Sequence, residues 1–116
     1  MTTEIADTVN FDEFLVKFST DSDFQFAHID FPLTVIWLEN EVTGVEKDTT
    51  LYLNKKDWQF KDFIDGTKYN VFYKKFRTET GFEIFAAGNQ TGVAVTYLFE
   101  KRENTWFLVR MEDSSD

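Results

Sequence analysis

The sequence predicts an α+β domain in which N-terminal helices pack on one face of a curved, mostly antiparallel β-sheet. Apolar residues with helical spacing are concentrated in the segment 11–31. The rest of the chain consists mainly of short runs of β-branched and aromatic residues, separated by turn residues. The most strand-like stretch is Val93–Glu112, which resembles two strands with large apolar side chains on both faces. Strands apolar on both faces need neighbours on both sides, so we expect this hairpin at the centre of the sheet.

Length and composition indicate a single domain. A chain of 116 residues forms one core, and 14 phenylalanines and 3 tryptophans indicate a core built from aromatic rings. Cysteine is absent, which excludes disulfides, thiolate zinc sites and a cysteine nucleophile. We expect a flexible leader at 1–9, one domain at 10–112 and a frayed acidic tail at 113–116.

The chain is acidic, with 12 Lys and Arg against 21 Asp and Glu and a formal net charge of -9. Such a field repels nucleic acids and anionic membranes and favours cations or basic partners, although solubility alone also explains it. No stretch is apolar enough to suggest a membrane span. We therefore expect no nucleic-acid partner and no membrane-spanning segment.

Two helices are expected in the N-terminal third. Asn10 is a good N-cap and Glu13 completes a capping box. One apolar stripe follows at helical spacing, formed by Phe11, Phe14, Leu15 and Phe18. The polar run 19–23 breaks this helix and starts a second one, with Asp21 and Asp23 at its N-terminus. The second helix should end near Ile29, since the residue before Pro32 is extended.

Strands and one further helix fill the remainder. A buried strand is expected at 33–39 and a short strand at 49–54, separated by an acidic turn or mobile loop that contains Gly44. Asn54 is expected to cap a helix that ends at Gly66, with Phe60, Phe63 and Ile64 on one side. Strands at 69–77 and 82–87 form a hairpin before the central one.

The loop length of the central hairpin decides which residues share a face. With two or four loop residues, odd positions of the first strand lie beside even positions of the second, and three or five reverse this. The candidate cavity wall then consists of Val95, Tyr97, Phe99, Trp106, Leu108 and Arg110. The other face consists of Ala94, Thr96, Leu98, Phe107, Val109 and Met111.

Several short runs carry a resemblance to a known family. They are Phe11-Asp12-Glu13-Phe14, Phe18-Ser19-Thr20-Asp21, Phe24-Gln25, Ile29-Asp30-Phe31-Pro32-Leu33, Asp57-Trp58 and Trp106-Phe107-Leu108-Val109-Arg110. Together they resemble a bacterial domain-of-unknown-function family from gut Bacteroidetes. The resemblance implies the cone-shaped, cystatin-like fold of nuclear transport factor 2. It also implies an exported or lipid-anchored protein of the periplasm or cell surface, although this chain starts without a signal peptide. It brings no catalytic residues, and His28 stands where family members often have a basic residue.

Candidate chemistry is sparse. His28 is the only histidine and could act as a base beside a nearby aspartate, although a lone helical histidine is more often a capping or surface residue. The pair Asp21 and Asp23 suggests a calcium loop, but its sixth and twelfth positions hold Phe26 and Pro32 instead of glycine and glutamate. We expect no metal and no cofactor.

Aromatic residues are the remaining candidates for a ligand site. A pocket for an apolar or sugar-like ligand could be lined by Trp37, Tyr52, Trp58, Tyr69, Tyr73, Tyr97 and Trp106, although an aromatic core has the same composition. The candidate ligand-binding residues are Tyr97, Trp106, Arg110, Trp37 and His28. Arg110 could bind a carboxylate or phosphate of a ligand. An internal Glu or Asp is its expected partner, because buried charges are normally paired.

Three functional hypotheses follow from these residues. The favoured one is a non-catalytic binding domain for a small molecule, peptide or protein, acting as a monomer or homodimer. The alternatives are an isomerase- or dehydratase-like enzyme with His28 or a carboxylate as base, and an acidic inhibitor or immunity-like protein. Only a cavity that holds a base would favour the enzyme.

Overall fold

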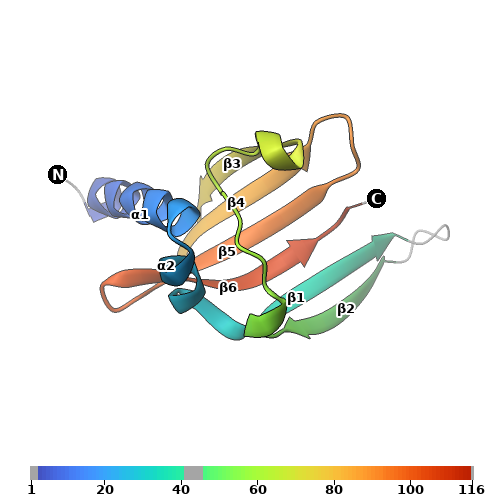
Figure 1. Cartoon of the computed structure of the whole chain (residues 1–116), viewed down its shortest axis with the longest axis horizontal. Helices are drawn as coiled ribbons and strands as arrows, with labels where there is room; N and C mark the ends of the chain where they lie inside the picture. Colours follow the sequence, from blue (N-terminus) through green and yellow to red (C-terminus); the bar gives the residue numbers. More distant parts are fainter. Residues whose placement is uncertain (1–2, 41–45, 116) are drawn as a thin grey trace.

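The computed structural model describes residues 3–40 and 46–115, and it contains two helices followed by a sheet (Figure 1). The helices come first and the strands follow, with two short 3-10 turns between β2 and β3. The elements are α1 (Thr3–Thr20), α2 (Ser22–Ala27), β1 (Ile29–Asn40), β2 (Glu46–Leu53), η1 (Lys55–Asp57), η2 (Thr67–Tyr69), β3 (Val71–Arg77), β4 (Gly81–Gly88), β5 (Ala94–Arg102) and β6 (Thr105–Asp113).

The described strands form one sheet in the order β2-β1-β6-β5-β4-β3. All neighbours are antiparallel except β1 and β6, which are parallel. The helices lie on one face, called the inner face below, and the opposite side is called the outer face (Figure 1). This arrangement confirms the predicted α+β class, the mostly antiparallel sheet and the central position of the β5–β6 hairpin.

Several predicted boundaries are wrong. Helix α1 begins at Thr3, so Asn10 lies inside it and is not an N-cap, and residues 3–9 are helical instead of a leader. No glycine or proline interrupts 3–10, so nothing stops the helix from extending backwards. Strand β2 begins at Glu46, which shortens the expected loop, and Gly44 lies outside the described residues. Asp21 does cap α2, since its side chain accepts a hydrogen bond from the Phe24 amide at 3.1 Å.

Aromatic rings from α1 fill the inner face as predicted. Phe11 stacks on Phe82 at a ring-centroid distance of 4.4 Å and meets Trp106 edge-on at 5.3 Å. Phe18 lies edge-on to Phe99 at 5.4 Å. These rings are almost fully buried, and such tilted or edge-on pairs contribute stability beyond their burial. The core therefore lies where α1 crosses the sheet, toward one end of the strands.

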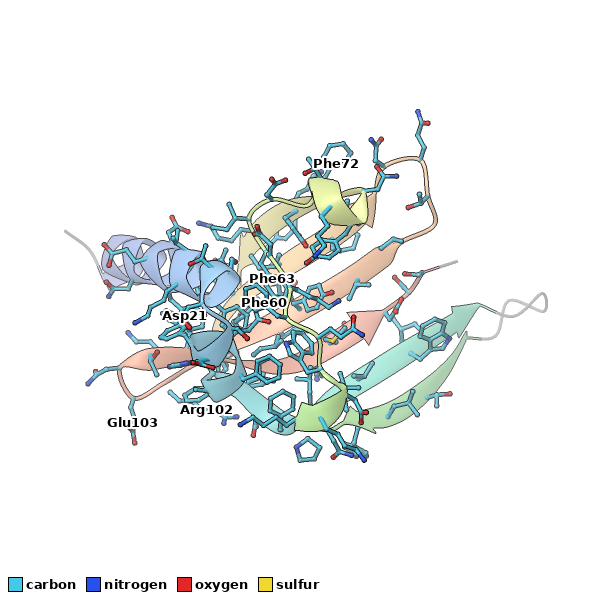
Figure 2. The ribbon with its side chains drawn as sticks, in the orientation of Figure 1. Asp21, Phe60, Phe63, Phe72, Arg102 and Glu103 are labelled. Carbon is cyan, nitrogen blue, oxygen red and sulfur yellow. The ribbon has the colours of Figure 1, made fainter. Side chains whose placement is uncertain are left out.

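Residues 54–70, called the strap below, connect β2 to β3 across the inner face (Figure 1). The helix predicted between Asn54 and Gly66 is wrong, because only the single turn η1 forms between these residues. Phe63 points into the core, whereas Phe60 and Ile64 are exposed, so the three do not share one face (Figure 2). The prediction rested on a cap at Asn54, a stop at Gly66 and the apolar spacing between them. The chain instead takes an irregular path that buries Trp58 and Phe63.

Gln25 of α2 fastens the strap to the helices. Its Nε2 donates to the carbonyls of Phe18 at 2.7 Å and Lys61 at 2.8 Å. Its Oε1 accepts from Trp58 Nε1 at 2.9 Å and from the Lys61 amide at 3.0 Å. All four hydrogen-bonding positions of the side-chain amide are used, and Gln25 is 0% exposed. The Phe63 amide adds a bond to Ser19 Oγ at 3.1 Å.

The end of the chain continues the sheet. Asp113 is the last residue of β6, the Ser114 amide donates to the Ala94 carbonyl at 2.9 Å, and the Ala94 amide donates to Ser115 Oγ at 2.9 Å. The prediction of a frayed tail is therefore wrong for residues 113–115. These bonds hold the Asp113 carboxylate at a defined place beside β5. Within the described residues, no helix is long and apolar enough to cross a membrane.

Candidate functional site

A β-bulge in β6 determines which side chains face the cavity. The β5–β6 turn has two residues, Glu103 and Asn104, because Arg102 pairs with Thr105. Phe99 pairs with Leu108, but Leu98 pairs with Arg110, so Val109 is an extra residue on β6. One extra residue reverses the alternation of side chains beyond it.

Because of the bulge, Arg110 and Met111 lie on the faces opposite to those predicted. Arg110 lies on the outer face beside Leu98 and Thr34, and Met111 lies on the inner face beside Tyr97 and Val35. Both predictions were wrong because they assumed unbroken alternation. The expectation of an internal partner is confirmed, since Arg110 Nη2 lies 3.2 Å from Glu112 Oε1.

The candidate site is a hollow of about 290 Å³ on the inner face, between the strap and strands β3 to β6. Three phenols and two charged groups contribute its polar surface: Tyr69, Tyr73, Tyr97, Lys61 and Asp113. Apolar side chains form the remainder: Val71, Ala86, Val93, Val95 and Met111. A few polar groups in an apolar lining are typical of small-molecule sites.

A second hollow of about 400 Å³ adjoins the first at Met111. Besides Met111, it is lined by Val35, Leu51, Tyr52 and Leu53 of β1 and β2. This lining is almost entirely apolar. The two hollows together are called the inner groove below, with a polar half at β3 to β6 and an apolar half at β1, β2 and β6.

Burial raises the pKa of two cavity phenols, Tyr73 and Tyr97. Desolvation raises the pKa of Tyr73 to about 12, and nearby Tyr69 and Asp62 add to the effect. Burial also raises the pKa of Tyr97 far above its usual value, with contributions from Tyr73 and Asp113. The Tyr73 hydroxyl donates to the Asp62 carbonyl at 2.8 Å. Tyr97 has no hydrogen-bond partner among the described residues, so its neutral hydroxyl is free to bond a ligand.

Because Tyr73 and Tyr97 are shielded from solvent, we expect the folded domain to lose stability in alkali. Because the folded pKa of Tyr97 exceeds its unfolded value near 10, its contribution is complete below about pH 10 and is lost as pH rises further. Urea unfolding of wild type should therefore show a larger fall between about pH 9 and about pH 11 than Tyr97→Phe shows. Tyr52→Phe, at a 66% exposed position, is the control and should follow wild type. Equal falls in wild type and Tyr97→Phe would contradict the prediction.

The other candidate ligand-binding residues do not line the inner groove. His28 ends α2, where its Nδ1 lies 2.7 Å from the Phe24 carbonyl and its ring stacks on Phe24 at 3.9 Å. It lines neither half of the inner groove. Trp106 is buried in the core against Phe11 and Phe82. Trp37 is half-buried on β1, where it pairs with Asp113 on the inner face.

A further hollow of about 390 Å³ lies over the bulge at Arg110, with Thr34, Leu98 and Glu100 in its wall. Glu112 pairs with the Arg110 guanidinium, and Glu100 adds a second negative charge in the lining. Because these carboxylates offset the positive charge of Arg110, the hollow should bind an anion more weakly than a hollow with an unpaired arginine would. The free groups of the inner groove make it the better candidate.

Sequence reasoning named Tyr69, Tyr73 and Tyr97 among the possible lining residues of a pocket, and it missed Lys61, Met111 and Asp113. Lys61 was placed on a helix that does not form, Met111 was assigned to the wrong face, and Asp113 was assigned to the tail. One sequence signal for Asp113 was available, because strand composition continues from Trp106 up to it. Among the described residues, no group of three histidine, aspartate or glutamate side chains could hold a metal ion.

The fold is NTF2-like, as the resemblance implied. Among solved structures, the chain is similar to an NTF2-like protein from Bacteroides fragilis, with a TM-score of 0.61 and 20% identity. The match covers 92% of this chain and 47% of the Bacteroides fragilis protein. This chain therefore spans about half the length of that protein. No protein-family model matches the sequence, and no similar curated protein is found.

Proposed function

We propose that this chain is a non-catalytic binding domain that holds a small molecule in the inner groove. The observation that carries the proposal is the unpartnered Tyr97 hydroxyl inside a hollow of about 290 Å³ that opens onto an apolar one of about 400 Å³. Small-molecule sites combine these features, an apolar concave wall and a few polar groups that fix orientation.

The chemistry of the polar half favours binding over catalysis. A phenol with a pKa of about 12, as at Tyr73, stays protonated at neutral pH and acts as a hydrogen-bond donor, not as a base. His28, the expected base, is at the C-terminal cap of α2 and lines neither hollow. The enzyme hypothesis therefore loses His28 as its base, and Asp113 is the one carboxylate among the described residues that lines the polar half.

Filling the polar half tests the proposal. Ala86→Phe places a ring in the hollow beside Tyr73 and Val95, whereas Ala87→Phe places the same ring on the outer face of β4. We expect fragments from a small-molecule library, detected by ligand-observed NMR, to bind wild type and Ala87→Phe. Binding to Ala86→Phe should weaken about tenfold or more, a loss of about 1.4 kcal/mol.

Amide spectra of both variants check that each remains folded. Fragment binding that survives Ala86→Phe but is lost in Ala87→Phe would locate the site on the outer face and contradict the proposal. Absence of any bound fragment in wild type would also count against it.

A further inference from the structure

One row of side chains links the two halves of the inner groove. Tyr97 pairs with Met111, Met111 with Val35, and Val35 with Leu51, so the row crosses β5, β6, β1 and β2 on one face. Three strand spacings of about 4.8 Å make this row about 14 Å long. It offers a continuous surface for an elongated molecule.

A negative charge is available beside this row, two residues along β6 from Met111. Asp113 lies between Val95 of β5 and Trp37 of β1 on the inner face. Its Oδ1 accepts the Ser115 amide at 2.9 Å, and the carboxylate forms no ion pair within the described part of the chain. Tyr97, whose free hydroxyl faces the same hollow, is the nearest phenol on β5.

This combination fits an ammonium group. A carboxylate binds it through a charge-assisted hydrogen bond, and aromatic rings stabilise it through their negative faces. Asp113 has an aromatic neighbour on each side, Tyr97 diagonally on β5 and Trp37 directly on β1. The net charge of -9 attracts cations to the whole molecule.

The opposite end of the row is apolar and open to solvent. Val35, Leu51, Leu53 and Met111 form it, and Leu51 is 53% exposed. Exposed apolar side chains that adjoin a pocket mark a place where an apolar ligand group can be buried. A ligand that bridges both ends must therefore have a polar head and an apolar body.

We propose that the inner groove binds a cationic amphiphile, with its ammonium group at Asp113 and its apolar chain over Met111, Val35 and Leu51. The proposal rests on the proposed function and names the chemical class of its ligand. An anionic head would have to use Lys61, whose ammonium lies 5.8 Å from the Trp58 ring centroid and 5.7 Å from that of Tyr69. Asp113 would then repel the ligand.

Three probes with the same decyl chain separate the contributions of head and chain. Calorimetric titration uses decylammonium and decanoate below their micellar concentrations and decanol below its solubility limit. It should give one site per chain for decylammonium. We expect its affinity to exceed that of decanoate about tenfold, because opposite charges attract and like charges repel at short range.

Matched variants test whether Asp113 causes the preference for a cationic head group. Asp113→Asn should remove most of the advantage of decylammonium, whereas Glu112→Gln removes the same charge from the outer face and should preserve it. Leu51→Asn, at an exposed position, should weaken all probes that bind wild type by a similar factor.

The outcomes distinguish the two proposals. Equal or tighter binding of decanoate, or equal effects of Asp113→Asn and Glu112→Gln, would overturn the cationic head and leave the groove intact. If no decyl probe binds while fragments still bind in a manner sensitive to Ala86→Phe, the amphiphile inference fails alone. If neither the decyl probes nor the fragments bind to wild type, the proposed function is overturned as well.

Discussion

Gln25→Leu is expected to destabilise the domain by about 4 kcal/mol, because it leaves several buried backbone and indole groups without partners. The affected groups are the Phe18 and Lys61 carbonyls, the Lys61 amide and Trp58 Nε1. Leucine has a similar volume, so the loss reports hydrogen bonds and not a cavity. Urea unfolding measures it, with Gln59→Leu at an exposed strap position as the control that should change by less than about 0.5 kcal/mol.

A loss below about 1 kcal/mol in Gln25→Leu would contradict the role of the side-chain amide. Hydrogen exchange gives a second readout, since the Lys61 and Phe63 amides of the strap should exchange faster in the variant. Because Lys61 and Tyr69 line the groove, we also expect weaker fragment binding.

Trp106→Ala is expected to cost about 3 to 5 kcal/mol, the range for truncating a large aromatic side chain in a core. Trp106 is only 3% exposed and contacts Phe11 of α1 and Phe82 of β4 edge-on. Its loss leaves a void between helix and sheet. Trp37→Ala, at a half-buried position on β1, is the comparison and should cost less. A Trp106→Ala cost under about 1 kcal/mol would exclude it from the core.

The class of fold was predictable because its main signals are local. The apolar stripe from Phe11 to Phe18 predicted the packing face of α1, and the apolar Val93–Glu112 stretch predicted the central hairpin. Asp21 as a helix cap followed from side-chain chemistry. Each of these depends on neighbours in sequence.

The groove was only partly predictable because its geometry depends on distant contacts. No glycine or proline marks the bulge at Val109, so alternation put Arg110 on the inner face in place of Met111. The strap depends on Gln25, which is distant in sequence from Trp58 and Lys61. Asp113 became a candidate only when its pairing beside Trp37 and Val95 was known.

An amide NMR titration with decylammonium tests most directly whether the inner groove is the binding site. The account predicts the largest shift changes at Val35, Tyr97, Met111 and Asp113, with little change on the outer face. Changes centred on Leu98, Arg110 and Thr34, around the hollow over the bulge, would contradict it.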